Sequence, residues 1–448
     1  MRKSGFVLCL LVASFCSLCA LAGEEPEAPD APASQDRFRL KAEIKVNVRN
    51  SAFEEVRVKF PFPPEMIPPG QDGVYERTTA RGSSFELSNL ALIGEADLTP
   101  DIAGLVRIHI LDLYNRNPTS SDDRVSVREA WIRFGKRAES LEGSPGSNFY
   151  AIIGKAPRFS RQPLRRLESY GLWGTALGRF EQLQLQVGGS IGRNLYWRAH
   201  VANGNPLFMR DPNALAGDNG TPERAPGNID PVYESGFPIL YDAKASEVNL
   251  SGNVEGGAGL GFRWLREGSR DGADVMGWYF KRKLADEVPI RGSFYEGDLD
   301  LLKGAGIPLP FRGNDKEEYG INVEARAGGL HAFVQYVRQD IANLGRRGYE
   351  TEVGYRFKLN GLVALGDTPV LYWIEPAFRY STIDNRFRPP SNFVAPSMGW
   401  DWRKYDIGLR VGIVSGVDIT AEYARHDMIL LAKTLHPDEM LVTLRAGF

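Results

Sequence analysis

The last ten residues, 439–448, alternate between two kinds of side chain in a way that few folds accommodate. Successive residues of an extended strand point to opposite faces, and here one face is apolar and the other mostly polar. In water, such a strand with a free edge invites edge-to-edge pairing. In a closed sheet that crosses a membrane, it can pair with the first strand while its apolar face meets lipid. The pattern therefore predicts the closing strand of a transmembrane β-barrel. The apolar face comprises Met440, Val442, Leu444, Ala446 and Phe448, and the other face includes Glu439, Thr443, Arg445 and Gly447.

The first 36 residues have the pattern of an export signal followed by a polar spacer. Arg2 and Lys3 precede an apolar run, and Ala-Leu-Ala at 20–22 resembles a cleavage site. The run is short for an uncleaved membrane helix. We therefore expect residues 1–22 to be a signal peptide. Residues 23–36 are acidic and rich in Pro and Ala, and we expect them to be a disordered periplasmic segment.

Cysteine content and charge exclude several classes of function. All three cysteines, Cys9, Cys16 and Cys19, lie within the expected signal. The mature chain would then have no disulfide, thiolate metal site or cysteine nucleophile, and we expect no cofactor or metal. Removal of Arg2 and Lys3 with the signal leaves 52 of the 54 basic residues and all 56 acidic residues. The mature chain would be slightly acidic, so its net charge does not indicate a nucleic-acid partner.

Segments of about ten alternating residues recur between residues 37 and 448 and predict an all-β fold. The alternation breaks within 84–98 and 124–135, which suggests β-bulges. Tight turns with Gly or Asn are expected at 188–189, 328–329, 360–361 and 415–416. A soluble β-sandwich or β-helix would usually split into two domains at this size, and we find no linker. We therefore predict a transmembrane antiparallel β-barrel of about 16 strands over 37–448. The predicted strands lie near 37–48, 84–98, 104–114, 124–135, 148–155, 180–187, 193–202, 258–266, 273–283, 318–327, 330–339, 349–359, 369–381, 403–414, 417–426 and 440–448.

The first predicted strand has a basic face that would line the lumen. Its polar face carries five basic residues and one acidic residue, Glu43. A basic row along the wall of a water channel would attract anions, although ordinary solvated lumen polarity is the alternative for any single residue. We take Arg39, Lys41 and Lys45 as candidate pore-lining residues. The whole face comprises Arg37, Arg39, Lys41, Glu43, Lys45, Asn47 and Arg49.

A second basic cluster follows the fifth predicted strand, in the third loop on the expected outer side. Arg158, Arg161, Arg165 and Arg166 lie close together there, with Glu168 as the nearest acid. Guanidinium groups donate paired hydrogen bonds that suit phosphate, sulfate or carboxylate. One interpretation is a surface loop that binds lipopolysaccharide phosphates. Prolines and apolar residues among the arginines favour an ordered loop that folds inward and constricts the pore, and we take these four arginines as candidate pore-lining residues.

Acidic residues gather on other predicted strand faces, which suggests that the lumen has a basic side and an acidic side. Such a transverse field weakens the case for strict anion selectivity. The acidic residues are Glu350, Glu352, Asp406, Asp418 and Glu422.

The chain resembles the phosphate-selective porin O/P family in three internal segments and in its closing strand. The segments are VREAWIRF at 127–134, AIIGK at 151–155 and LYWRAHVANG at 195–204. The resemblance implies a sixteen-stranded barrel, usually a homotrimer, in which loop three narrows each pore and basic residues guide anions. By analogy, Arg158, Arg161, Arg165 and Arg166 would line the constriction. The acidic strand faces depart from the family, and no residue here singles out phosphate.

Together these features predict an outer-membrane porin for small anionic solutes, such as phosphate-like oxyanions or small carboxylates. A channel that exports or takes up anionic polysaccharide or oligosaccharide is the alternative. An energy-coupled receptor would need a plug domain before the barrel, and we expect none. An enzyme would need a catalytic group, for which His426 beside Asp427 is the nearest candidate. A solvated histidine at the barrel rim is the better interpretation of His426, so we do not expect an enzyme. The expected partners are outer-membrane lipid, lipopolysaccharide, small anions, further copies in a homotrimer, and the barrel-assembly machinery, which would recognise the strand ending at Phe448.

Overall fold

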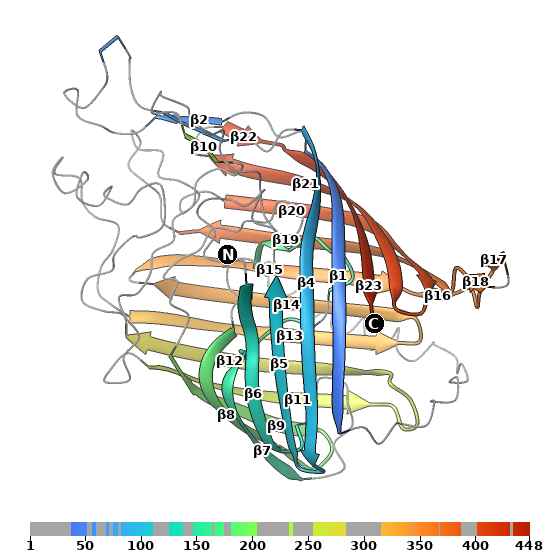
Figure 1. The fold of residues 1–448 in the computed structure, drawn as a ribbon. Helices are drawn as coiled ribbons and strands as arrows, with labels where there is room; N and C mark the ends of the chain where they lie inside the picture. Colours follow the sequence, from blue (N-terminus) through green and yellow to red (C-terminus); the bar gives the residue numbers. More distant parts are fainter. Residues whose placement is uncertain are drawn as a thin grey trace.

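The chain forms a closed barrel of antiparallel strands in a computed structural model (Figure 1). The structure describes residues 37–51, 56–59, 69–70, 75–78, 82–110, 125–137, 147–163, 165–173, 181–203, 233–235, 254–283, 315–341, 343–366, 368–386, 401–430 and 433–448. The expected signal peptide, 1–22, and the expected spacer, 23–36, lie outside these ranges. Among the described residues, no helix is long and apolar enough to cross a membrane.

The main sheet contains eighteen strands, of which sixteen form the barrel wall. The other two are β16 (Phe357–Lys358), which follows β15 along the same wall position, and β22 (Lys433–Leu435), a short strand that pairs with β21. Sixteen wall strands confirm the number predicted from the alternating segments. The wall strands are β1 (Phe38–Ser51), β4 (Gly82–Thr99), β5 (Ile102–Ile110), β6 (Val125–Gly135), β7 (Asn148–Pro157), β8 (Glu181–Ile191), β9 (Leu195–Ala202), β11 (Glu255–Leu265), β12 (Gly272–Lys283), β13 (Asp315–Ala327), β14 (Leu330–Ile341), β15 (Leu344–Tyr355), β19 (Trp373–Asn385), β20 (Asp401–Val414), β21 (Val417–Leu430) and β23 (Asp438–Gly447).

Pairing of the first strand with the last closes the barrel. β1 is antiparallel to both β4 and β23. Its register with β23 runs from Glu43 opposite Gly447 to Ser51 opposite Glu439. The terminal residue also takes part, because the Ala42 nitrogen donates to the Phe448 oxygen at 2.7 Å and the Phe448 nitrogen donates to the Ala42 oxygen at 3.0 Å. The prediction that residues 439–448 pair with the first strand is confirmed.

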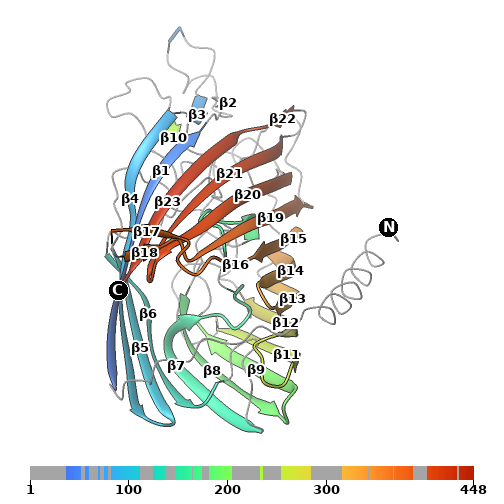
Figure 2. The same ribbon diagram turned by 90° about the vertical axis from the view of Figure 1, so that its right-hand side faces the viewer.

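The wall carries its apolar side chains outside and its polar side chains inside. Leu40 is 82% exposed and Phe85 is 74% exposed on the outer surface, whereas Glu352, Lys404 and Asp406 are fully buried. This arrangement is the reverse of a soluble core and is the pattern expected where lipid surrounds the wall. Figure 2 shows the strands surrounding an interior, in which the green segment that follows β7 lies.

Two of the four predicted tight turns are confirmed and two are wrong. The chain turns at 328–329 between β13 and β14 and at 415–416 between β20 and β21. Gly188 and Gly189 instead lie within β8, where a Cβ atom on Gly188 would come within 2.6 Å of the Tyr150 hydroxyl. This glycine therefore makes room for a neighbouring aromatic ring. At 360–361 the chain continues into a hairpin of β17 (Val363–Leu365) and β18 (Thr368–Val370), which projects from the barrel (Figure 1).

Register shifts occur in both strands whose alternation breaks. In the pairing of β1 with β4, Lys45 is opposite Asn89 and Val46 is opposite Leu87, so Ser88 is an extra residue. In the pairing of β5 with β6, Arg128 is extra in the same way. An extra residue exchanges the two faces of a strand, which explains why a single alternation could not describe either segment.

A small sheet lies apart from the wall among the described residues. It comprises β2 (Val56–Lys59), β3 (Tyr75–Thr78) and β10 (Tyr233–Ser235), with β2 and β3 antiparallel and β10 parallel to β3. These segments come from the chain that joins β1 to β4 and the chain that joins β9 to β11. The small sheet therefore links two connections on the same end of the barrel.

The turn at Gly416 should be sensitive to a side chain. Gly416 has φ of +77°, and a Cβ atom there would lie 2.3 Å from the Gly447 oxygen beside the barrel seam. The left-handed backbone and this close contact should both disfavour an alanine side chain. We therefore expect the free energy of unfolding of the Gly416→Ala variant to be about 2 kcal/mol lower than that of the original protein. Urea unfolding of the protein in lipid vesicles would measure this change. Gly277→Ala is the control, because no atom lies within 4 Å of its Cβ position, and equal midpoints for the two variants would contradict the prediction.

Candidate functional site

Loop three, defined as residues 158–180 between β7 and β8, folds into the barrel over its described part. Leu167, Leu172 and Trp173 of this loop are almost completely buried. The loop begins at the end of β7 and reaches β15, β20 and β21 on another side of the wall. An ordered, inward-folded third loop was predicted from its prolines and apolar residues, and the structure confirms it.

Carboxylates on the wall hold the loop through its backbone. The Glu352 carboxylate accepts a hydrogen bond from the Arg166 nitrogen at 2.5 Å, and Glu350 accepts one from the Trp173 nitrogen at 3.0 Å. Glu422 accepts hydrogen bonds from the backbone nitrogens of Glu168 and Ser169. Charged acceptors form stronger hydrogen bonds than neutral ones, so these carboxylates fix the path of the loop.

The acidic face predicted from the sequence is therefore an anchor as well as a source of charge. Arg379 lies among the same carboxylates, 3.0 Å from Asp406 and 3.4 Å from Glu352, and it donates to the Ser169 hydroxyl at 2.6 Å. Lys404 lies 2.8 Å from Asp406. All these groups are buried, and pairing offsets the cost of removing charges from water. Arg379 and Lys404 therefore weaken the transverse electric field that the acidic strand faces were expected to produce across the lumen.

Two of the four predicted loop arginines, Arg158 and Arg166, anchor the loop to the wall through their side chains. Arg158 is buried, with Glu318 at 3.0 Å and Glu255 at 3.3 Å, and its guanidinium lies 3.8 Å from the centre of the Phe280 ring. Arg166 lies 3.0 Å from Glu375 on β19. Both side chains line the interior, but most of their charge is directed to wall carboxylates.

The other two loop arginines differ from these anchors in their contacts and exposure. Arg161 is 41% exposed, and its nearest carboxylate within the described ranges, Glu129, is 3.7 Å away. The guanidinium of Arg165 lies over the Tyr170 ring at 3.5 Å. Of the four, Arg161 is the most exposed.

The two anchoring arginines differ in the direction of their pKa shifts. Burial tends to lower the pKa of Arg158, but Glu255 and Glu318 more than offset it, and the pKa lies above its ordinary value. At Arg166 burial dominates over the attraction of Glu375, and the pKa is lowered. Because the ordinary pKa of arginine is far above neutrality, both guanidinium groups stay charged in water-filled surroundings.

The three candidates on β1 lie on its inner face at different depths. Arg39 and Lys41 both pair with Glu95 of β4, at 3.1 Å and 2.9 Å, and remain half-exposed. Lys45 is deeper and lies 2.9 Å from Glu168 of loop three. The three candidates therefore follow one another along the wall, and Lys45, the most buried of the three, meets the loop.

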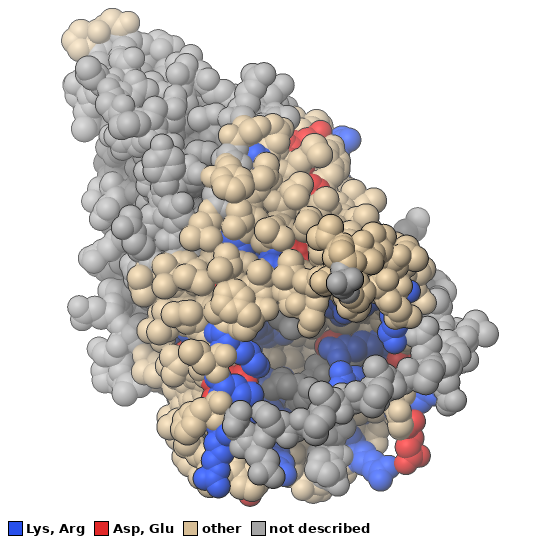
Figure 3. All heavy atoms as spheres, turned by 45° about the vertical axis from the view of Figure 1, so that its right-hand side comes forward, with Lys and Arg blue, Asp and Glu red and all other residues tan. Residues whose placement is uncertain are grey.

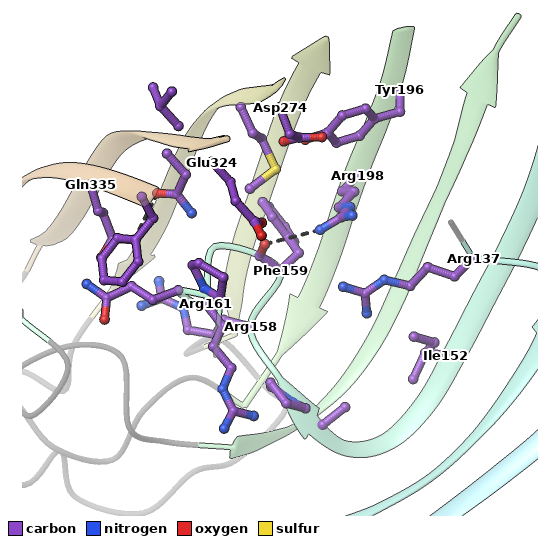
Figure 4. Close-up of a pocket in the computed structure, with 18 of the residues that line it drawn as sticks. Arg137, Ile152, Arg158, Phe159, Arg161, Tyr196, Arg198, Asp274, Glu324 and Gln335 are labelled. Carbon is purple, nitrogen blue, oxygen red and sulfur yellow. Dashed lines mark hydrogen bonds between the residues drawn. The ribbon is translucent and has the colours of Figure 1, made fainter. Parts of the chain in front are cut away.

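Loop three and the wall from β5 to β14 line an open cavity of about 610 Å³. Eight arginines and three carboxylates line it, and two of the arginines, Arg158 and Arg166, are paired with carboxylates outside this lining. Figure 4 shows Arg137 directed toward Arg198 and Phe159 across this space. In the space-filling view, lysine and arginine atoms also gather around a hollow in the surface (Figure 3). The arginines are Arg107, Arg133, Arg137, Arg158, Arg161, Arg166, Arg198 and Arg326, and the carboxylates are Glu129, Asp274 and Glu324.

Sequence reasoning missed five of these arginines: Arg107, Arg133, Arg137, Arg198 and Arg326. The extra residue Arg128 shifts the faces of β6, so that Ile132 and Phe134 point outward and Arg133 points inward. Placing a bulge at 128 in the alternating pattern would have identified Arg133. For Arg198, the alternation of β9 already indicated an inward face, but a single arginine between aromatic residues gave no cluster to notice.

The histidines do not form the arrangement considered for an enzyme. His426 is buried, where it accepts a hydrogen bond from the Trp402 indole at 3.2 Å and lies 3.6 Å from Glu439. The carboxylate of Asp427 instead contacts His436, at 2.7 Å. In the described part of the chain, no group of three or more metal-binding side chains is found.

Comparisons with known proteins give a likeness in fold. No family model matches the chain, and no curated protein sequence matches it. Among solved structures, OprB of Pseudomonas putida matches with a TM-score of 0.51 and 10% identity, over 92% of this chain and 94% of OprB. The outer-membrane channel DcaP of Acinetobacter baumannii and OmpF of Salmonella typhi each match with a TM-score of 0.49 and 10% identity, over 92% of this chain and 97% of theirs.

The likeness to OprB supports the transmembrane barrel fold that the wall pairing shows. At 10% identity it carries no information about the solute. The resemblance to the phosphate-selective porin O/P family, which rests on the sequence segments quoted above, stays a prediction.

The anchoring of loop three by Glu422 can be tested by proteolysis. Glu422→Ala leaves two loop amides without their acceptor, which should cost about 1–3 kcal/mol of loop stability. We expect trypsin to cut at Arg161, Arg165 or Arg166 at least several times faster in this variant than in the original protein. Glu317→Ala is the control, because Glu317 pairs with Lys281 on the exposed surface. Unchanged cleavage in Glu422→Ala would show that the carboxylate does not hold the loop.

Proposed function

We propose that the protein is an outer-membrane porin, a water-filled channel through which small anionic solutes diffuse. The observation that carries this proposal is the cavity beside loop three, where eight arginines outnumber three carboxylates. Confined positive charge in a narrow water-filled space raises the local concentration of anions. The barrel fold and the likeness to OprB support a channel, and the arginines support its preference for anions.

The pairing of the acids strengthens this preference. Glu350, Glu352 and Glu422 accept backbone hydrogen bonds from loop three, and Arg379 and Lys404 lie among the wall carboxylates. These acids therefore contribute less negative potential to the pore than their number suggests. The cavity arginines with weak partners keep most of their field, so the balance favours anions.

The basic residues on β1 and loop three would guide anions along this path. Arg39 and Lys41 are half-exposed on the inner face of β1, and Lys45 connects their row to loop three through Glu168. Arg161 extends the positive surface from the loop. Phosphate-like oxyanions and small carboxylates are the solutes that guanidinium and ammonium groups suit best.

A channel for anionic polysaccharide is less well supported. A polymer needs a continuous wide lumen, and loop three lies inside the barrel with fixed contacts to β12–β13, β15 and β21. Small solutes require only the space beside the loop. We therefore propose diffusion of small anions rather than passage of long chains.

This function implies a location and partners. We propose export by a signal peptide at residues 1–22 and insertion by the barrel-assembly machinery through the strand that ends at Phe448. Lipid and lipopolysaccharide would then surround the exposed apolar wall. A homotrimer is expected from the family resemblance.

Planar-bilayer recording with a gradient of potassium chloride tests the proposal. We expect the reversal potential to show chloride preferred over potassium. Replacing Arg107, Arg133 and Arg161 by Ser removes cavity charge that has weak partners, and chloride preference should fall by about threefold or more, with the largest change at low salt. Arg193→Ser is the control, because Arg193 is 80% exposed on a turn outside the cavity. Potassium preference in the original protein, or unchanged selectivity in the triple variant, would contradict the proposal.

A further inference from the structure

The cavity beside loop three has a second property that a simple anion channel does not need. Its lining includes a set of apolar side chains beside the arginines. Inward positions of such barrels are normally polar because water fills the lumen. The apolar members include Trp131, Ile152, Ala156, Phe159, Met276 and Phe333.

These apolar residues come from several directions. Ile152 and Ala156 of β7 form a buried cluster with Tyr150, against which Trp131 of β6 packs. Phe159 of loop three, Met276 of β12 and Phe333 of β14 also line the cavity and are buried in the same barrel interior. Packing of the loop against the wall accounts for their burial but leaves the open space of about 610 Å³ between them. Trp131 is only partly buried, so apolar surface is offered to a solute mainly there, with the buried residues packed behind it.

Arginine donors are directed to the same space. Figure 4 shows the guanidinium of Arg137 pointing toward Arg198 and Phe159, with Ile152 beside it. The Nε atoms of Arg107 and Arg133 are buried and have no hydrogen-bond partner among the described residues. Buried donors are nearly always satisfied, so these two atoms mark donor capacity that the described wall leaves unused beside the cavity. A carboxylate can accept two hydrogen bonds from one guanidinium.

The three carboxylates of the cavity already have partners. Glu129 accepts a hydrogen bond from the Trp131 indole at 3.1 Å and lies 3.4 Å from Arg107. Asp274 accepts one from the Tyr196 hydroxyl at 2.6 Å. Their negative charge is therefore directed to the wall, and they oppose a bound anion less than free carboxylates would.

Glu324 is held in the same way. It lies 3.0 Å from Arg326 and 3.2 Å from His331. The surface that remains for a solute is a mixture of apolar side chains and arginines.

We propose that this cavity binds anions that carry an apolar body, with arene carboxylates such as benzoate as the best-fitting class. The proposal rests on the proposed anion channel and names the solute class that its cavity would favour. An apolar cavity of about 150 Å³ is enough for benzene, so the space here admits an aromatic ring together with its carboxylate and water. Burial of the ring adds binding free energy that acetate and phosphate cannot gain. Binding must stay weak enough for release, as transport requires.

Interruption of the ion current by added solutes tests the proposal with the full-length protein in planar bilayers. At neutral pH, we expect benzoate to reach half-maximal interruption at a concentration about tenfold or more below that of acetate, by burial of the ring. Cyclohexanecarboxylate should behave like benzoate. Benzamide, which has the ring without the charge, should interrupt the current much less. Each solute is also applied to a protein-free bilayer, which reports its effect on the lipid.

Two variants separate the contributions of the cavity. Met276→Ser removes apolar surface, and the preference for benzoate over acetate should fall about threefold. Met428→Ser is its matched control, because Met428 is buried elsewhere in the barrel and does not line the cavity. Arg133→Gln should weaken benzoate and acetate together. Resistance of each variant to unfolding in detergent at room temperature, read from its mobility on a gel, verifies the barrel before recording.

The outcomes distinguish this inference from the proposed function. A channel that prefers chloride but responds equally to benzoate and acetate would overturn the apolar-anion site and leave the anion porin in place. Equal loss of benzoate preference in Met276→Ser and Met428→Ser would also overturn the site. A channel that prefers potassium would overturn the anion porin itself.

Discussion

The structure depends on closure of the sheet by backbone hydrogen bonds between β1 and β23. In hydrocarbon, an open sheet edge would leave amide and carbonyl groups without partners, so a strand wall is viable only when it closes on itself. The register from Glu43 opposite Gly447 to Ser51 opposite Glu439 provides this closure. It also determines which residues face inward, because a shift by one residue would turn every side chain of a strand to the other face.

Closure reverses the usual distribution of polarity, so the interior is stabilised by charge pairing and by loop three. Glu350, Glu352 and Glu422 satisfy loop amides, while Arg379 and Lys404 offset their charge. Removing one member would leave a buried charge unpaired, which is costly. The loop thus takes the place that an apolar core has in a soluble protein, and the shape of the pore follows from its anchors.

The sequence was sufficient for the wall because strand alternation is a local property. It predicted sixteen strands, the pairing of the first with the last, and breaks in the two strands where Ser88 and Arg128 are extra. It was insufficient for the anchors, since Glu422 and the Glu168 amide are 254 residues apart. Glycine was read as a turn at 188–189, whereas Gly188 accommodates Tyr150 across the sheet. Such contacts depend on which strands become neighbours, which no local pattern contains.

If the protein is the anion channel proposed above, its charge selectivity would follow from pairing geometry and not from composition. The chain has 54 basic and 56 acidic residues, so its total charge would favour neither ion. Carboxylates that accept loop amides are held at the wall beside Arg379 and Lys404, whereas Arg161 has a carboxylate no closer than 3.7 Å among the residues that the structure describes. In the proposed channel, stability and selectivity would therefore be coupled, because the contacts that fix loop three would also decide which charges a solute meets. A change in any anchor should alter both properties together, even when it leaves the number of charges unchanged.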